Sequence, residues 1–106
     1  MLKQTLYNNA LYDTYGSLLT PNQQEIYEYT FKEDLSLAEV AENKGISRSA
    51  VHDTLKKAQA LLETYEAKLG FVHKEEQREE LYKQLSALEI PEVTKLVIQL
   101  RNIEEL

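Results

Sequence analysis

Three observations predict an all-α fold for this chain of 106 residues. Glycine and proline occur only three and two times, whereas leucine, glutamate, lysine and alanine, which favour helices, are abundant. Apolar residues recur at spacings of three and four along most of the chain. Ser36–Leu55 carries the start and stop signals of two short helices joined by a tight turn, a helix-turn-helix. We therefore expect a helix-turn-helix domain with a long recognition helix at residues 1–69 and a C-terminal helical hairpin at residues 70–106.

The first helix is expected to run from about residue 4 to residue 15. Tyr7, Leu11 and Tyr15 recur every four residues and form one apolar row, and Gly16 follows as a helix terminator. The N-terminal segment MLKQTLYNN has no sustained apolar stretch, so no signal peptide is expected.

The second helix is expected to begin at Thr20-Pro21, because threonine caps helices and proline suits the first helical position. It should continue to about Glu33. It is expected to bury Ile26 and some of Tyr29, Thr30 and Phe31.

The helix-turn-helix is predicted from its caps. Ser36 and Glu39 have the spacing of a capping box at the start of the third helix. Gly45 follows that helix and can adopt a positive φ without strain, and Ile46 is expected to fill the gap beneath the turn. Ser47 then caps the fourth helix. The buried positions of the pair are expected to be Val40, Ala41, Val51 and Leu55.

The fourth helix is expected to be long. Val51, Leu55, Ala58 and Leu62 keep one apolar row for three turns, and the helix can continue to about Lys68 before Gly70. At about 100° per residue, its opposite side carries the polar side chains of its first turns. This side of the helix should therefore be exposed.

The C-terminal segment predicts two further helices, because a charged stretch and a leucine row end at Ile90-Pro91 and a second apolar row follows. Both rows alternate spacings of three and four, which is typical of a narrow helical seam. The seam packs on the first domain or, alternatively, joins two protomers. If it joins two protomers, it is an oligomerisation element. Its residues are Leu81, Leu85, Leu88, Val93, Leu96, Leu100 and Ile103.

The net charge of −6 is unusual for a general nucleic-acid binder. The distribution is uneven, however. Residues 1–43 carry a net −5, residues 44–57 a net +3, and residues 58–106 a net −4. The one positive window covers the turn and the start of the fourth helix, although a charged helix is by default a solvated face.

The positive window supplies the candidate nucleic-acid-binding residues. Ser49 and His52 would reach base edges, while Arg48 and Lys56 would hold phosphates near the positive end of the helix dipole. The alternative is that these are ordinary exposed residues on an inherited fold. The full set is Lys44, Arg48, Ser49, His52, Asp53, Lys56 and Lys57.

The charges also limit the expected affinity. Asp53 would repel phosphates, although it could accept a hydrogen bond from a cytosine amine. Four cations allow about four phosphate contacts, which corresponds to a salt slope near −3.6. One chain should therefore bind weakly, whereas a dimer would double the contacts and could meet half-sites roughly 34 Å apart.

An enzyme is not indicated, and no catalytic residue is assigned. Ser49, His52 and Asp53 lie on one helical turn and cannot converge on a substrate, and His73 stands on a separate segment. No glycine-rich phosphate loop, cysteine or metal-ligand pattern is present in the sequence, and the glutamate run at residues 75–80 is typical of a solvated face. No cofactor, small-molecule substrate or membrane insertion is expected, and the composition fits a cytoplasmic protein.

With these motifs in place, two resemblances are apparent. Residues 19–62 resemble region 4 of bacterial sigma factors, which have a leucine-threonine start, an acidic scaffold helix and a serine-capped recognition helix. Nearly the whole chain resembles the YlxM family of small Firmicute proteins associated with the signal recognition particle. The matching segments are LYDTYGSLLTPNQ, SLAEVAENKGISRSAVHDTLKKA and LLETYEAKL.

The resemblance implies a DNA-binding-like fold in a protein linked to protein targeting. This chain differs from sigma factors in one respect. Its recognition helix continues through Glu63 and Glu66, whereas that of sigma factors continues in arginine and lysine. Three functions follow as expectations. The chain is a non-enzymatic regulatory component that binds nucleic acid, or the RNA or protein of the particle, through its helix-turn-helix. It is alternatively a DNA-binding transcriptional regulator, or an adaptor that docks Glu63 and Glu66 on a basic partner such as the particle's GTPase. In each case a homo-oligomer, a dimer, is expected.

Overall fold

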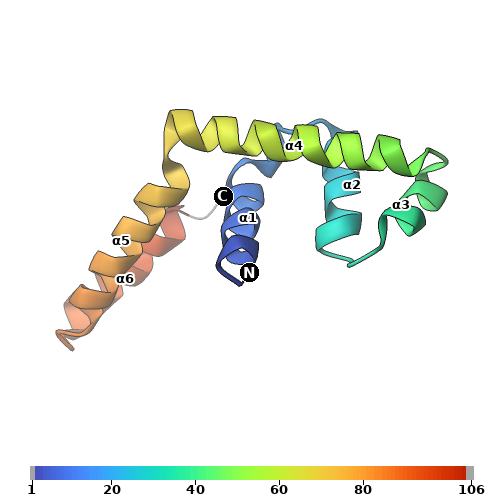
Figure 1. The fold of residues 1–106 in the computed structure, drawn as a ribbon. Coiled ribbons are helices and arrows are strands. Elements are labelled where there is room, and N and C mark those ends of the chain that lie inside the picture. Colours follow the sequence, from blue (N-terminus) through green and yellow to red (C-terminus); the bar gives the residue numbers. More distant parts are fainter. Residues whose placement is uncertain (1, 105–106) are drawn as a thin grey trace. The chain divides into compact units, whose positions relative to one another are not determined.

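A computed structural model of the chain describes residues 2–104. Figure 1 shows that the regular elements of these residues are all helical, which confirms the predicted all-α fold. They are α1 (Leu2–Tyr15), the 3₁₀ turn η1 (Gly16–Leu18), α2 (Pro21–Phe31), α3 (Leu37–Lys44), α4 (Arg48–Leu69), α5 (Phe71–Ser86) and α6 (Pro91–Glu104).

The chain divides into two compact units, Met1–Gly70 and Phe71–Leu106. Met1, at the start of the first unit, and residues 105–106, at the end of the second, lie outside the described residues. The first unit contains α1 to α4 and the second contains α5 and α6.

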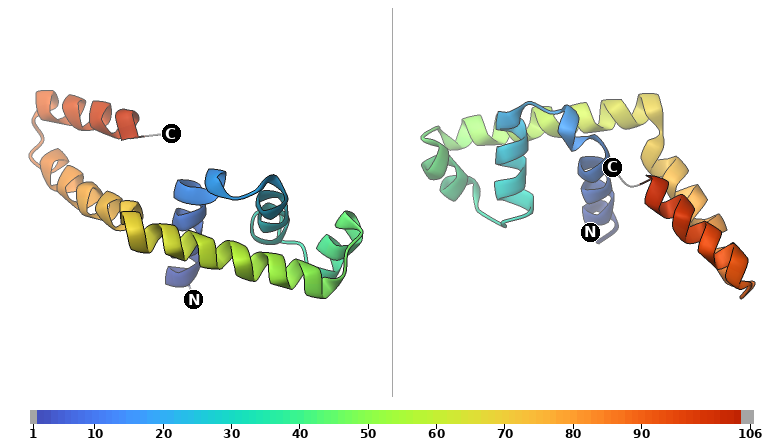
Figure 2. Two further views of the ribbon diagram at one scale, coloured as in Figure 1. Left: turned by 90° about the horizontal axis from the view of Figure 1, so that it is seen from above. Right: turned by 180° about the vertical axis from the view of Figure 1, so that it is seen from behind.

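In the first unit, α4 passes the three preceding helices in turn: α3 near its N-terminus, then α2, then α1 (Figures 1 and 2). Ile26, Val40 and Val51 are completely buried where α2, α3 and α4 meet, and Ala41 is nearly so. The small Ala41 side chain lets α4 cross close to α3. The half-buried side chains packed against this cluster are Tyr29, Leu35, Leu37 and Leu55.

The predicted caps are all present. Thr20 and Ser36 each begin a helix with a complete capping box, in which Gln23 and Glu39 accept from the cap N–H groups. The Ser47 hydroxyl accepts from the backbone N–H of Ala50 at the start of α4. Each cap satisfies N–H groups that would otherwise lack a partner, which fixes where these helices begin.

The helix ends are also determined by local backbone geometry. Gly45 (φ 67°) adopts the left-handed conformation that the sequence predicts for it, and Gly70 (φ 65°), which follows the fourth helix as expected, adopts it too. The second helix is shorter than expected, because Asp34 has φ 57° and the N–H of Leu35 bonds back to the carbonyl of Tyr29. This pattern closes α2 at Phe31, two residues before the predicted end.

One predicted burial position is wrong, because Ile46 is 38% exposed beside the turn. On α2, Tyr29 and Thr30 are half-buried as expected, and Phe31 at the end of the helix is exposed. Leu35 and Leu37 pack against the core beneath the helix-turn-helix instead. Ile46 is held by its backbone, since its N–H bonds to the carbonyl of Ala41. The turn is therefore closed by the backbone of residue 46, and the Ile46 side chain does not fill the space beneath it.

Tyrosines join α1 to the rest of the first unit. The rings of Tyr12 and Tyr27 stack at a centroid distance of 4.5 Å, and Lys32 lies over the Tyr12 ring at 5.3 Å. Burial, together with a hydrogen bond to Glu28, raises the pKa of Tyr12 to about 12. Tyr15 is 1% exposed and its ring lies 6.0 Å from that of Tyr65 on α4.

The second unit is an antiparallel hairpin of α5 and α6 (Figures 1 and 2). Charged and aromatic side chains hold its two helices together. Arg101 makes two hydrogen bonds to Glu79, at 2.6 and 3.2 Å. Arg78 Nε lies 2.7 Å from Glu104 Oε1, and the Tyr82 hydroxyl donates to that same oxygen at 2.6 Å. Polar contacts therefore contribute to holding α5 against α6.

The leucine seam does not lie between the two hairpin helices. Tyr82 and Val97 are buried there, whereas most of the predicted seam is solvent-exposed. Val93 alone of the seven predicted positions is half-buried. The exposed members are Leu81, Leu85, Leu88, Leu96, Leu100 and Ile103.

Candidate nucleic-acid interface

The first turns of α4 present a polar, solvent-exposed face. The helix begins at the Ser47 cap, and its inward row starts with the buried Val51. Six of the seven predicted nucleic-acid-binding residues are exposed together on the other side of these turns: Arg48, Ser49, His52, Asp53, Lys56 and Lys57. We call these six residues the α4 polar face. Its position at a helix N-terminus adds partial positive charge from the backbone dipoles.

Lys44 is separated from this face. Its ammonium group donates to Glu25 at 3.0 Å and its side chain is only 21% exposed. The same contact, with a second hydrogen bond from Tyr29, holds the pKa of Glu25 below its usual value. Lys44 therefore joins α3 to α2, and its charge is neutralised within the protein.

Within the α4 polar face, the acidic residue lies beside a histidine. Asp53 Oδ1 is 3.9 Å from His52 Nδ1, and both side chains are about two-thirds exposed, at 71% and 65%. At that distance the pair is loose, and either side chain can turn to a ligand. The face carries three cations, Arg48, Lys56 and Lys57, against the single carboxylate.

The later turns of α4 are occupied by α1. Gln59 donates to Asn8 at 3.1 Å, and the Tyr7 hydroxyl donates to Glu63 at 3.2 Å. The Tyr15 hydroxyl donates to Glu66 at 2.6 Å. The two glutamates that the sequence suggests as a partner-binding surface thus hold α1 against α4.

Sequence reasoning missed these contacts, although a signal for one of them was present. Glu66 lies four residues after the buried Leu62 and so continues the inward row of α4. Tyr15 is likewise four residues after the buried Leu11. Two inward rows that end in a carboxylate and a phenol predict a hydrogen bond between them.

The chemistry available at the α4 polar face is the binding of an anion. Guanidinium and ammonium groups beside exposed hydroxyl and imidazole groups suit a phosphate backbone and the edges of bases. Among residues 2–104, no group of three histidine, cysteine, aspartate or glutamate side chains is placed to hold a metal ion. In that same part of the chain, every helix is too short or too polar to cross a bilayer.

Comparison with known proteins gives the relatives of this chain. The family model of UPF0122, described as "Putative helix-turn-helix protein, YlxM / p13 like", matches residues 2–101. A UPF0122 protein of Anoxybacillus flavithermus is 42% identical over 110 aligned positions, which cover 98% of this chain and all of the relative. One of Geobacillus sp. WCH70 is 38% identical over all of this chain and 99% of the relative. One of Desulforamulus reducens reaches 56% identity over 62% of this chain and 56% of the relative.

Proposed function

Because this chain belongs to the YlxM/p13-like UPF0122 family, we propose that it is a non-enzymatic regulatory protein that binds nucleic acid with the α4 polar face. The observation that supports the proposal is the joint exposure of Arg48, Lys56 and Lys57 at the N-terminal turns of a helix-turn-helix second helix. The resemblance to YlxM makes the RNA of the signal recognition particle the first ligand to test.

The local charge supports this reading more strongly than the total charge opposes it. The chain as a whole carries −6, but the carboxylate of Glu25 on α2 is neutralised by Lys44. The exposed residues between positions 47 and 58 include three cations and one carboxylate, that of Asp53. Contacts at this face are screened over about 8 Å at physiological salt, so distant acidic residues act weakly on it.

The adaptor function has less structural support. Glu63 and Glu66 would need to be available to a basic partner, yet both accept hydrogen bonds from α1 tyrosines. Docking through Glu66 would require breaking a contact to the buried Tyr15, at an energetic cost. A DNA-binding transcriptional regulator uses the same α4 residues as an RNA-binding protein, so the choice of ligand separates these two functions.

Fluorescence anisotropy with labelled particle RNA and with duplex DNA, each at about 50 mM and 150 mM salt, tests the proposal. The informative variant is Arg48→Glu combined with Lys56→Glu. The matched control is Lys3→Glu combined with Lys68→Glu, which makes the same change in net charge at exposed sites away from the start of α4. Circular dichroism establishes that both variants are folded.

We expect the wild-type protein to bind one of the two ligands with a Kd in the micromolar range, typical of roughly three phosphate contacts. The α4 variant should bind roughly tenfold more weakly or worse, and the control within about threefold of the wild type. Preference for the RNA supports a role with the particle, and preference for the duplex supports a transcriptional regulator. Equal losses in the two variants, or no binding at about 50 mM salt, would overturn the proposal.

A further inference from the structure

The hairpin exposes an apolar face that its own helices leave uncovered. Leu81, Leu88 and Leu96 are each nearly 60% exposed, and Ile103 is 78% exposed. We call the six exposed seam residues the leucine face: Leu81, Leu85, Leu88, Leu96, Leu100 and Ile103. Single exposed leucines are common on protein surfaces, but a regular row on each of two neighbouring helices is not.

The two rows lie on the same side of the hairpin. On α5, the buried Tyr82 directly follows Leu81, and on α6 the buried Val97 directly follows Leu96. Each leucine row is therefore turned about 100° from its inward residue, in the same rotational sense. Because the two helices are antiparallel, equal rotations in the same sense bring both rows to one side. The result is a continuous apolar surface two helices wide.

We propose that the leucine face binds the leucine face of a second copy of this chain, so that two hairpins form an antiparallel four-helix bundle. The alternation of three and four residues in both rows is the pattern that such bundles bury. Six side chains that are about half exposed offer on the order of 600 Å² of apolar surface per chain. With flanking residues this approaches the roughly 800 Å² per partner that a stable dimer buries.

The polar residues around the leucine face also favour a second copy. Gln77, Gln84 and Gln99 lie three or four residues from a seam leucine and carry no charge. Arg78 and Glu104 lie at the same spacing from Leu81 and Leu100, but their charges are paired with each other. Two copies can therefore approach without like charges meeting at the centre of the interface. Uncharged amides at this position can also pair with their counterparts across a two-fold axis.

The charges at the two ends set the orientation. Lys74 lies seven residues before Leu81, at the open end of the hairpin, and Glu92 lies four residues before Leu96, at the loop end. Both are exposed. An antiparallel pairing brings the Lys74 end of each copy to the Glu92 end of the other. A parallel pairing would place like charges together, so the antiparallel arrangement is favoured.

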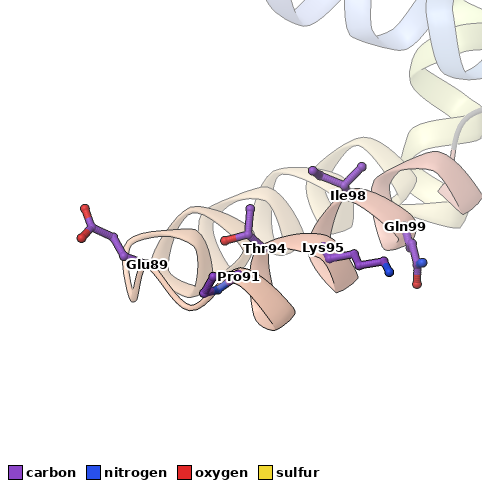
Figure 3. Close-up of a pocket in the computed structure, with 6 residues that line it drawn as sticks. All are labelled: Glu89, Pro91, Thr94, Lys95, Ile98 and Gln99. Carbon is purple, nitrogen blue, oxygen red and sulfur yellow. The ribbon is translucent and has the colours of Figure 1, made fainter.

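A different surface of the same unit provides a control. A shallow groove runs along α6 and is lined by Pro91, Thr94, Ile98 and neighbouring residues (Figure 3). Ile98 is 52% exposed, but it follows Leu96 by two residues and so lies about 200° around the helix from the leucine face. A charge placed there should not disturb the proposed interface.

Sedimentation velocity of the full chain, without nucleic acid, tests the inference at concentrations from about 1 to 100 μM. We expect a dimer that dissociates on dilution. Leu85→Glu combined with Leu100→Glu should raise the dissociation constant at least roughly tenfold, because charged groups would be buried opposite one another. Ile98→Glu should leave it within about twofold. Since no nucleic acid is present, failure of this test is distinct from failure of the proposed function.

Two results would overturn the inference. One is a wild-type monomer throughout the range of concentrations, and the other is a dimer that the leucine-face variant leaves intact while its circular dichroism is unchanged. The orientation is tested separately. Lys74→Glu or Glu92→Lys alone should weaken the dimer about two- to fivefold, and the double variant should restore it. A double variant weaker than either single one would exclude the antiparallel arrangement.

Discussion

The Tyr15 hydroxyl donates a hydrogen bond of 2.6 Å to the Glu66 carboxylate, which joins the end of α1 to the last turns of α4. Tyr15 is 1% exposed, so the contact lies at the edge of the core of the first unit. It engages the Glu66 carboxylate inside the first unit, so a partner could use that carboxylate only by displacing Tyr15. A residue that the sequence suggests for recognition is therefore used to fix the position of the first helix.

Replacing Tyr15 by phenylalanine should lower the free energy of unfolding by about 1 to 2 kcal/mol, because a half-buried carboxylate loses a short hydrogen bond. Tyr7→Phe is the matched control, since its hydroxyl bonds to the exposed Glu63 at 3.2 Å. That change should cost less than about 0.5 kcal/mol. Urea denaturation measures both variants. Equal stabilities of the two would contradict the importance of the Tyr15–Glu66 contact.

Alanine at Gly45 should lower the free energy of unfolding by about 1 kcal/mol, because φ is 67° there and an L-residue is strained in that region. Nothing lies within 4 Å of a Cβ added at this position, so the cost is that of the backbone alone. Asparagine tolerates the conformation better, and Gly45→Asn should be the milder change. Asn43→Ala, in the regular part of α3, should change the stability by less than about 0.5 kcal/mol. If the Gly45 variants are as stable as the wild type, the turn geometry described above is wrong.

Replacing Lys44 by methionine should raise the pKa of Glu25 toward its ordinary value. A carboxyl group with a depressed pKa in the folded protein adds stability above its unfolded pKa, near 4.5, and this stability is lost as the pH falls through the folded pKa. The wild type should therefore be more stable than the variant at neutral pH and should lose this advantage in acid. Carboxyl titration by NMR and melting curves between about pH 2 and 7 measure both effects. An unchanged Glu25 pKa would show that Lys44 is not its partner.

The caps made most of the first unit predictable from sequence. Ser36, Glu39 and Ser47 act through contacts three residues away, and Gly45 acts through its own backbone, so nothing distant is needed to interpret them. The end of α2 depended on Asp34, whose positive φ is unusual for a residue other than glycine. Sequence alone could not favour that conformation over one more helical turn.

The candidate site was predictable as a face but not as a set of free charges. Arg48 and Lys56 follow from helical phase, whereas the sequestration of Lys44 depends on Glu25, nineteen residues earlier on another helix. The leucine row had a similar ambiguity. A regular apolar row predicts that its side chains are buried, but it does not identify the surface that buries them. In the hairpin, the buried positions are Tyr82 and Val97 instead.

Tyr12 should resist ionisation, because burial and its hydrogen bond to Glu28 raise its pKa to about 12. The pKa values of Tyr27, Tyr29 and Tyr82 are raised as well. A group whose pKa is raised on folding adds stability below its unfolded value, near 10, and this stability is lost as the pH rises through 12. Phenolate absorbance should therefore show a late titration step that accompanies unfolding. The step should be missing in Tyr12→Phe. If that variant keeps it, another tyrosine is responsible.

The salt dependence of nucleic-acid binding should report how many cations are free. If all four cations contact phosphates, the slope of log K against log salt should be near −3.6 for one chain. Lys44 is bound to Glu25, so only three cations are available, and the expected slope is about −2.7. Lys57→Ala should reduce the slope by about 0.9, because one phosphate contact is lost. Lys44→Ala should leave it unchanged, since its ammonium group is already paired. Anisotropy titrations at four salt concentrations measure these slopes, and a slope that falls equally in both variants would place Lys44 in the interface despite its partner.

Two chains joined through their hairpins would double each slope, to about −5.4 for the wild type, so the same titration performed above and below the dimer dissociation constant connects the two proposals.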